Sequence, residues 1–441
     1  MAFKIDKQTL TDLGIFSNSA DESVYMIFNR CRTQGGISIM EQMFHNPLSD
    51  KEHITGRIEA IKFFEKAGMD FPFNTELFAP AEYYLSDVDV RSQLDIADKT
   101  LQRKMNGIIG SDAEFSKIHK GLVAAIEIID STLNFLAKAK TMEYGERVLS
   151  HFTEMPKEIL ELVAANKGAK KISFENCVDL DRAFRFKYRD EIMGLLKAIY
   201  YIDVYHSVAE VAIDRGFKFA NILDTKDNVI KLNGVFHPRL TNAIGNDITI
   251  DEKQNMVFLT GANMAGKSTI MKSIAIAIYI AHVGFPVAAQ SMDISLRSGM
   301  FTTINLPDNI NAGYSHFYSE VMRLKKVALE VSQDKNLVII FDELFRGTNV
   351  KDAYDATLEV VEAFSTIKEC TFIVSTHIIE AAEVLAQRCN NVQFVYMPTV
   401  MENGVPRYTY KIRQGVTEDR HGMVIINNEG IVNILEAAFK N

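Results

Sequence analysis

Eight residues from Gly261 to Ser268 have the types and the spacing of a phosphate-binding loop. They fit the pattern G-x-x-x-x-G-K-[ST], and they lie between an apolar run and a helix-like segment, as that pattern requires. Glycine permits backbone angles that a Cβ opposes, so consecutive amides can point into one concavity. Lys267 would then bring a positive charge to the outer phosphates, and the Ser268 hydroxyl would bind Mg²⁺. The expected nucleotide-binding residues are Gly261, Ala262, Asn263, Met264, Ala265, Gly266, Lys267, Ser268 and Thr269.

A pair of carboxylates follows a second apolar run. Leu337–Phe341 is continuously apolar, as is typical of a parallel strand buried on both faces, and Asp342 and Glu343 come directly after it. Ligands of such sheets bind at the carboxyl ends of the strands. Asp342 would therefore help to hold Mg²⁺, and Glu343 could polarise an attacking water as a general base.

A histidine follows a third apolar run. Thr371–Ser375 reads as a strand, and His377 lies two residues after it. His377 could sense the terminal phosphate or position the water, or it could be a surface histidine at the end of a strand.

Strand-like and helix-like segments alternate in the C-terminal half, which predicts an α/β sheet with helices on its faces. The expected strands are Met256–Thr260, Leu337–Phe341, Thr371–Ser375 and Val392–Tyr396, and the expected helices are Lys267–Val283, Glu320–Ser332, Ala353–Phe364 and Ile379–Arg388. Near the end, Asn403-Gly404 lies between two strand-like stretches and suits a type I′ hairpin turn.

The N-terminal half is mostly helix-like. Two stretches carry apolar residues at helical spacing and predict long helices. One comprises Leu122, Ala125, Ile126, Ile129, Leu133 and Leu136, and the other comprises Ile192, Leu195, Leu196, Ile199, Ile202 and Val208.

The composition limits the class of protein. The chain has 441 residues, a formal net charge of −9, and four cysteines of which no two lie close enough for a metal or redox pair. It has no apolar run of the ~20 residues that a membrane span requires and no secretory signal. We expect a cytoplasmic protein with free thiols and no membrane segment.

The motifs together resemble those of the MutS-type DNA mismatch-repair ATPases, which are relatives of the ABC ATPases. The resemblance is specific over residues 236–380, and it is looser over 10–230. It is carried by TGANMAGKST, by Phe341–Asn349, by Ser375-Thr-His377, by Ser315-x-Phe317-x-x-Glu320, and by Gly35-Gly36 and Asn46-Pro47 in the N-terminal half.

The resemblance implies a fold and a division into domains. We expect an α/β C-terminal P-loop NTPase domain of ABC-like type and a mainly α-helical N-terminal core and lever domain. The expected boundaries are a helical core at 1–110, lever helices at 111–224 with the family's DNA clamp absent or vestigial, and the ATPase domain at 225–441.

The resemblance also implies how the protein works. It predicts a homodimer that binds ATP and Mg²⁺ between its ATPase domains, with Ser315 reaching the γ-phosphate bound by the partner subunit. Lys267, Glu343 and His377 would be catalytic. ATP binding and hydrolysis would move the lever helices, with DNA as the expected partner.

The chain departs from the family pattern at five positions of the ATPase domain. Ala262 and Ala265 replace a proline and a glycine of the family's loop, and because both are small, phosphate binding should survive. Phe345 stands where the family has glycine, which could alter the dimer contact. Ala243 and Ile244 stand where the family commonly has an aromatic for adenine stacking, which leaves adenine selectivity open.

The family's other domains are also expected to be absent. Because the core-like pattern begins within the first 30 residues, we expect no mismatch-reading domain, and we expect no C-terminal dimerisation segment. A longer paralogue could supply the mismatch reader.

One basic stretch, Lys167–Arg189, is a candidate for contact with nucleic acid. It combines seven basic with three acidic residues and interleaves aromatics in Arg185-Phe-Lys187-Tyr-Arg189. The same pattern would arise from a solvated helix face with core aromatics. For the whole chain, the alternative to a DNA-binding ATPase is a nucleotide-gated module that acts on a partner protein. A chromosome-maintenance ATPase fits less well, because only about 70 residues separate Ser268 from Asp342.

Overall fold

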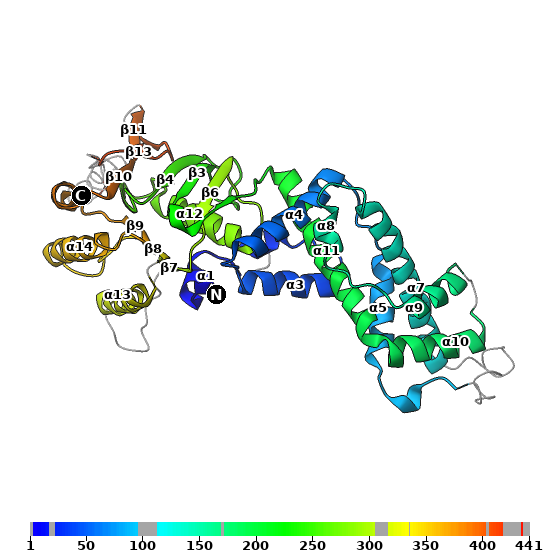
Figure 1. The fold of residues 1–441 in the computed structure, drawn as a ribbon. Helices are drawn as coiled ribbons and strands as arrows, with labels where there is room; N and C mark the ends of the chain where they lie inside the picture. Colours follow the sequence, from blue (N-terminus) through cyan, green and yellow to red (C-terminus); the bar gives the residue numbers. More distant parts are fainter. Residues whose placement is uncertain are drawn as a thin grey trace. The chain divides into compact units, whose positions relative to one another are not determined.

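The computed structural model describes residues 3–16, 23–95, 113–168, 172–304, 316–334, 336–402, 405–417 and 434. It divides into two compact units. We call Met1–Ile27, Phe44–Thr55 and Arg215–Asn441 the sheet unit, and Phe28–Met43 with Gly56–Asp214 the helical unit. Figure 1 labels the elements of both.

The sheet unit is built on seven strands in the order β1-β7-β8-β9-β5-β10-β13, parallel except for β13. The strands are β1 Lys4–Ile5, β5 Met256–Gly261, β7 Gly299–Thr303, β8 Leu337–Phe341, β9 Thr371–Ser375, β10 Val392–Met397 and β13 Arg413–Gln414. The helices are α1 Lys7–Asp12, α12 Lys267–Val283, α13 His316–Gln333, α14 Val350–Ser365 and α15 Glu380–Arg388, and the short α2 spans Val24–Phe28. The four expected strands and four expected helices are therefore confirmed, to within a few residues at their ends.

Apolar packing places the helices on the two faces of this sheet. Side chains of α13, α14 and α15 form one core with the inward faces of β5, β8 and β9. In Figure 1, α13 and α14 lie together on one side of these strands, and α12 lies on the other. Because β5, β8 and β9 are buried along their whole length, their carboxyl ends are fixed relative to one another.

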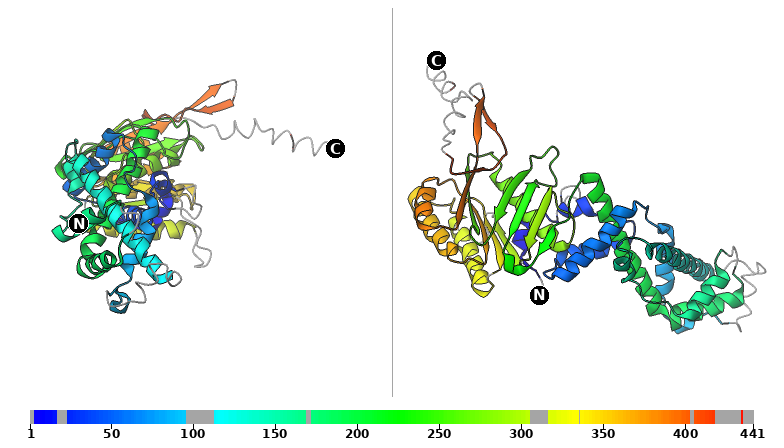
Figure 2. Two further views of the ribbon diagram at one scale, coloured as in Figure 1. Left: turned by 90° about the vertical axis from the view of Figure 1, so that its right-hand side faces the viewer. Right: turned by 45° about the horizontal axis from the view of Figure 1, so that its top comes forward.

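Two smaller sheets complete the sheet unit. One has the order β2-β6-β3-β4, with β2 Asn221–Leu223, β3 Ile230–Val235, β4 Asn246–Ile250 and β6 Ser291–Ser295. The other is the hairpin of β11 Thr399–Glu402 and β12 Val405–Tyr408, which projects from the unit in Figure 2. The pairing of Glu402 with Val405 fits the expected hairpin, while Asn403-Gly404 itself lies outside the described residues.

The N-terminal segment belongs to the sheet unit, which the sequence does not suggest. β1 extends the main sheet beside β7, with Lys4 opposite Gly299. Asp6 forms ion pairs with Arg323 and Lys326 of α13, and Asp12 accepts hydrogen bonds from the Thr302 side chain and the Ile304 amide. The expected helical core at 1–110 therefore includes segments, Met1–Ile27 and Phe44–Thr55, that the structure groups with the sheet unit.

The helical unit is built around two long helices, α7 and α11. Its helices are α3 Gln34–His45, α4 Lys51–Ala67, α5 Phe78–Ser86, α7 Ala113–Ala139, α8 Gly145–Leu149, α9 Lys157–Asn166, α10 Phe174–Asp181 and α11 Arg189–Arg215, and a π-helical turn spans Arg182–Lys187. The apolar stripe predicted on α11 is buried. On α7, Leu122, Ala125, Ile126 and Ile129 are buried, whereas Leu133 and Leu136 are half-buried. Among the described residues, no helix is both long and apolar enough to cross a membrane.

The Gly35-Gly36 pair has a packing role where α3 meets α11. A Cβ on Gly36 would lie 2.3 Å from Asp203 Oδ2, and one on Gly35 would lie 2.3 Å from the Tyr200 ring. Asp203 is buried and accepts hydrogen bonds from the amides of Arg32 and Thr33, just before α3 begins. The two glycines therefore permit a close approach that any side chain would prevent.

We expect Gly36→Ala to destabilise the protein by about 1–3 kcal/mol, because the added methyl overpacks a carboxylate that is already held by several hydrogen bonds. Gly194→Ala in α11 is the matched control, since a Cβ there meets no other atom within 4 Å. That substitution should stabilise by about 0.5–1 kcal/mol, the ordinary gain of alanine in a helix. Urea unfolding followed by circular dichroism measures both, and equal effects would contradict this account of the glycine pair.

Candidate active site

The loop after β5 has the backbone geometry of a phosphate cradle. Gly261 and Gly266 have φ of 145° and 100°, and Met264 has φ of 67°. A Cβ on Gly266 would lie 3.1 Å from the Tyr410 ring, so glycine also leaves room there. Gly266 caps α12, which begins at Lys267, so the amino end of a 17-residue helix opens into the loop. The positive end of the helix dipole and the free amides favour an anion at this point.

Lys267 folds back against the carbonyl oxygens of its own loop. Its Nζ donates to the carbonyl oxygens of Gly261 at 2.9 Å and Ala262 at 3.2 Å, and the side chain is buried. Burial lowers the pKa of Lys267, while the negative charges of Glu343 and Asp342 act on it in the opposite direction. The structure thus brings the lysine of the loop within electrostatic reach of both carboxylates.

Ser375 ties the acidic pair to the neighbouring strand. β9 lies between β5 and β8, with Ser375 in register with Leu259. The Ser375 hydroxyl donates to Asp342 Oδ1 and accepts a hydrogen bond from the Glu343 amide at 2.9 Å. The carboxylates after β8 are therefore tied to the end of β9, which is paired with β5.

Two basic side chains hold the Glu343 carboxylate. His377 Nε2 lies 2.8 Å from Oε1, and Arg346 Nη1 lies 2.8 Å from Oε2. Burial alone would raise the pKa of Glu343, but the hydrogen bond and charge of His377, with the charges of Arg346 and Lys267, bring it below its ordinary value. The carboxylate is therefore ionised at neutral pH and oriented. His377 pairs with Glu343 and is 39% exposed at the end of β9, so its role toward the phosphate or the water stays a prediction.

The backbone after β8 is unusual at two positions. Glu343 and Phe345 have φ of 54° and 62°, the left-handed region. For a bulky side chain this conformation costs about 1–2 kcal/mol. Phe345 is 3% exposed and packs within the apolar core of the sheet unit. Burial of a phenylalanine side chain contributes about 1.5–3 kcal/mol, which is enough to offset the strain.

A cavity of about 380 Å³ lies beside the phosphate loop. Its lining residues are Phe236, His237, Leu240, Thr241, Asn242, Ala243, Ile244, Asn246, Gly266, Thr269, Ile270, Ser273, Met397 and Tyr410. Burial, assisted by the charges of Arg239 and Lys272, lowers the pKa of His237 to about 4, so its ring is neutral at pH 7. Ala243 and Ile244 do line this cavity, as expected, but aromatic rings also reach it from Phe236 and Tyr410. No sequence pattern indicates Tyr410, which follows the hairpin strand β12 far along the chain from most of the other lining residues.

The remaining expected binding residues lie where the loop pattern places them. Asn263, Met264 and Thr269 are exposed, Ser268 is half-buried in the first turn of α12, and Ala265 is buried. Ser315 lies outside the described residues; α13 begins at the next position.

The basic stretch Lys167–Arg189 uses much of its charge inside the helical unit. Arg185 is fully buried and pairs with Asp181 through two hydrogen bonds, Nε to Oδ1 at 2.6 Å and Nη2 to Oδ2 at 2.7 Å. Lys187 pairs with Glu158, and Lys167 pairs with Asp130. The suggested contact of Arg185 with nucleic acid is therefore wrong, because its guanidinium is enclosed by protein. Lys170 and Lys171 lie outside the described residues.

A mainly parallel α/β sheet with a glycine-rich loop at the end of one strand and a carboxylate pair at the end of another defines a P-loop fold. Comparison with known families agrees: residues 257–440 match the model for MutS domain V, and residues 8–209 match that for MutS domain III. The chain belongs to the MutS family.

Individual relatives share moderate identity with the chain. The DNA mismatch repair protein MutS of Geobacillus sp. (strain WCH70) is 27% identical over 309 residues, which are 68% of this chain and 35% of that protein. MutS of Lysinibacillus sphaericus (strain C3-41) is 22% identical over 95% of this chain and 45% of its own length. DNA mismatch repair protein MSH7 of Arabidopsis thaliana is 23% identical over 99% of this chain and 44% of its own length. The chain spans less than half the length of these relatives.

Proposed function

We propose that this chain binds ATP with Mg²⁺ on the loop Gly261–Thr269 and hydrolyses it. One observation supports this most directly: the glycine-rich loop with the buried Lys267 follows β5, and the carboxylates of Asp342 and Glu343 follow β8 and are tied through Ser375 to β9, the strand between them. A glycine-rich loop and a carboxylate pair at the same edge of a sheet form an arrangement that a polyphosphate and its metal ion would complete.

Each group of residues in the site has a role that its chemistry suits. The loop amides and Lys267 bind the phosphates, and the Ser268 hydroxyl with the Asp342 carboxylate offers the hard oxygen ligands that Mg²⁺ prefers. Mg²⁺, when bound, neutralises charge on the phosphates. Glu343, held by His377 and Arg346, accepts a proton from the attacking water.

The cavity beside the loop would hold the nucleobase. It is close to the phosphate cradle, since Gly266 and Thr269 belong to both. Phe236 and Tyr410 supply aromatic rings for contact with a base, and the neutral His237 can donate or accept a hydrogen bond. These rings would stack against the base, a contact that the side chains of Ala243 and Ile244 do not provide.

We further propose that the sheet unit is an ABC-like ATPase domain that acts as a homodimer and that nucleotide state controls binding to DNA. The relatives are DNA mismatch repair proteins by name, and the match of residues 8–209 to MutS domain III covers α7 and most of α11. These helices would be the levers that carry the change. Ser315 would act in the partner subunit's site.

The test is DNA binding at several salt concentrations, with and without ATP, using duplex, branched and single-stranded DNA. We expect binding that depends on nucleotide and weakens steeply as salt rises, because bound counterions are released. Light scattering on the same samples should show the dimer with ATP.

One observation favours a second function. Because Arg185, Lys187 and Lys167 are engaged by acidic partners within the chain, the described part of the basic stretch offers less free charge than its sequence suggests. A nucleotide-gated module that binds a partner protein would need no such charge. Absence of binding to every DNA form at low salt, with ATP hydrolysis retained, would support this alternative and contradict the DNA-binding proposal.

A further inference from the structure

The loop from Asp342 to Asn349 connects the active site to α14. A backbone hydrogen bond and two buried side chains hold the backbone of this loop in place. Leu344 donates its amide to the Ser375 carbonyl at 3.2 Å, and both Leu344 and Phe345 are buried. Between them and β8 stands Glu343, itself in the left-handed region. The backbone that carries Glu343 is thus anchored on its far side by the Phe345 ring.

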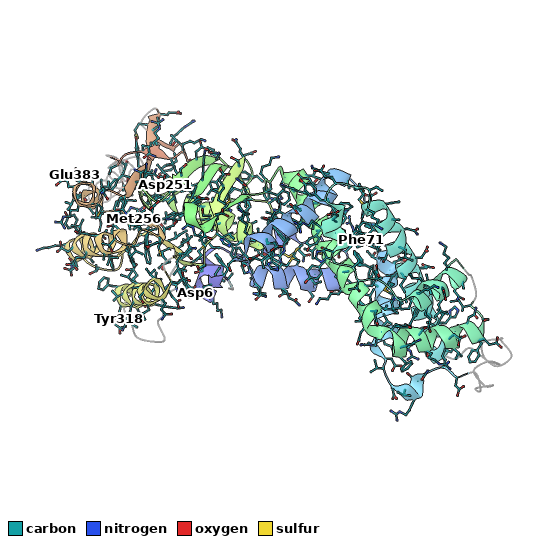
Figure 3. The ribbon with its side chains drawn as sticks, in the orientation of Figure 1. Asp6, Phe71, Asp251, Met256, Tyr318 and Glu383 are labelled. Carbon is teal, nitrogen blue, oxygen red and sulfur yellow. The ribbon has the colours of Figure 1, made fainter. Side chains whose placement is uncertain are left out.

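The Phe345 ring meets the first turn of α13. Its centroid lies 6.0 Å from that of Phe317, with the planes at 52°, a tilted arrangement that aromatic pairs favour. Phe317 packs against the apolar core, whereas the next residue, Tyr318, is 44% exposed and lies at the outer side of α13 in Figure 3. The second turn of α13 is fixed to β7, because Arg323 donates to the Thr302 carbonyl.

We propose that Phe345 and Phe317 are a positioning pair that sets Glu343 for reaction and couples it to the first turn of α13. This inference rests on the proposed ATP hydrolysis. Glycine at position 345 would adopt the same backbone angle without strain, but it would leave the loop without its anchor. Phenylalanine at position 345 therefore strains the backbone but fixes the conformation of the loop. A shift of α13 would move the Phe345 ring and, with it, the loop that carries Glu343.

The first experiment compares steady-state ATP hydrolysis by the wild type, Phe345→Gly, Phe317→Leu and the double variant. We expect each single substitution to lower kcat about tenfold with little change in KM for ATP, because binding by the phosphate loop is unaffected. We expect the double variant to be no slower than the slower single variant, since each change already breaks the same contact. If Phe345→Gly does not fold, Phe345→Leu, which keeps apolar bulk, replaces it.

The matched control is Phe364→Leu. Phe364 belongs to the same apolar core, but the rings that it contacts, Phe341 and Phe372, belong to the strands β8 and β9 and not to the loop or to α13. It should lower thermal stability while leaving kcat unchanged. A loss of kcat in proportion to stability across all variants would overturn the proposal, because simple core packing would then explain it.

A second readout does not depend on turnover. The chain contains no tryptophan, so Phe317→Trp adds a single fluorophore at the contact. We expect ATP to shift its emission, and we expect the shift to disappear when Phe345→Gly is added. An unchanged shift, or multiplicative losses of kcat in the double variant, would refute the coupling. If the wild type binds ATP without hydrolysing it, the proposed function itself fails, and this inference fails with it.

Discussion

Replacing Glu343 with glutamine should lower ATP turnover by on the order of 10²-fold or more while leaving ATP binding intact. The amide keeps the size of the side chain and can still meet His377 and Arg346, but it cannot accept a proton from water. Because the pKa of Glu343 lies below its ordinary value, the wild-type carboxylate is ionised throughout the neutral range. The effect should therefore appear in kcat and not in KM.

Lys267→Ala should reduce turnover by a similar factor and should also weaken ATP binding, since the lysine charge acts on the phosphates in both ground and transition states. Glu383→Gln and Lys351→Ala are matched controls on α15 and α14. Both side chains are exposed, and Figure 3 shows Glu383 at the outer side of its helix. Wild-type turnover in both Glu343→Gln and Lys267→Ala would show that the site does not hydrolyse ATP.

The elements that the sequence predicts well are those with a strong local pattern. β8 and β9 coincide with the expected Leu337–Phe341 and Thr371–Ser375, because continuous apolar runs bounded by polar residues admit few alternatives. α12 coincides with Lys267–Val283, because Gly266 and Gly284, both at positive φ, mark its two ends. The carboxylates and His377 follow directly, since parallel strands end at one edge of a sheet.

Contacts between distant parts of the chain could not be predicted in this way. β1 has two residues, which is too short for any periodic pattern, and its place depends on Asp6 reaching Arg323 across 317 positions. Tyr410 reaches the cavity only because the β12 strand returns toward the phosphate loop. The contact between Phe345 and Phe317 depends likewise on how α13 packs across the sheet, and the sequence of neither segment alone predicts that packing.

Arg185 shows how composition can mislead. In the sequence it alternates with aromatics, as in surfaces that bind nucleic acid, yet Asp181 lies one helical turn earlier and the two face each other. Tyr84 donates to Asp181 Oδ1 at 2.9 Å, and the Leu94 amide donates to Oδ2 at 3.0 Å. The Ser92 hydroxyl accepts from Arg185 at 2.8 Å. Asp181 and Arg185 together thus connect α5, the segment that contains Ser92 and Leu94, and their own helical segment.

Breaking this buried pair should be among the most destabilising single changes in the helical unit. Asp181→Asn leaves the buried Arg185 guanidinium with the partly exposed Asp87 carboxylate, 3.1 Å from Nη1, as its remaining charged partner. Removing one partner of a buried pair costs about 3–5 kcal/mol, and Asp87 should place the loss at the lower end of that range. Arg185→Met should cost a similar amount by leaving the Asp181 carboxylate uncompensated. Urea unfolding followed by circular dichroism measures both. Lys187→Met is the matched control from the same stretch: its pair with Glu158 is exposed, so no loss beyond measurement error is expected.

The double variant Asp181→Leu with Arg185→Met, compared with Asp181→Leu and Arg185→Met alone, separates the charge pair from the network around it. If burial of an unpaired charge dominates each single effect, the double variant should lose much less than the sum of the two. It should not recover fully, because Tyr84 and the Leu94 amide would then lack their acceptor. Additive losses would mean that Asp181 and Arg185 stabilise the unit independently. Unchanged DNA binding by the Lys187→Met variant would further show that the Lys187 side chain makes no important contact with nucleic acid.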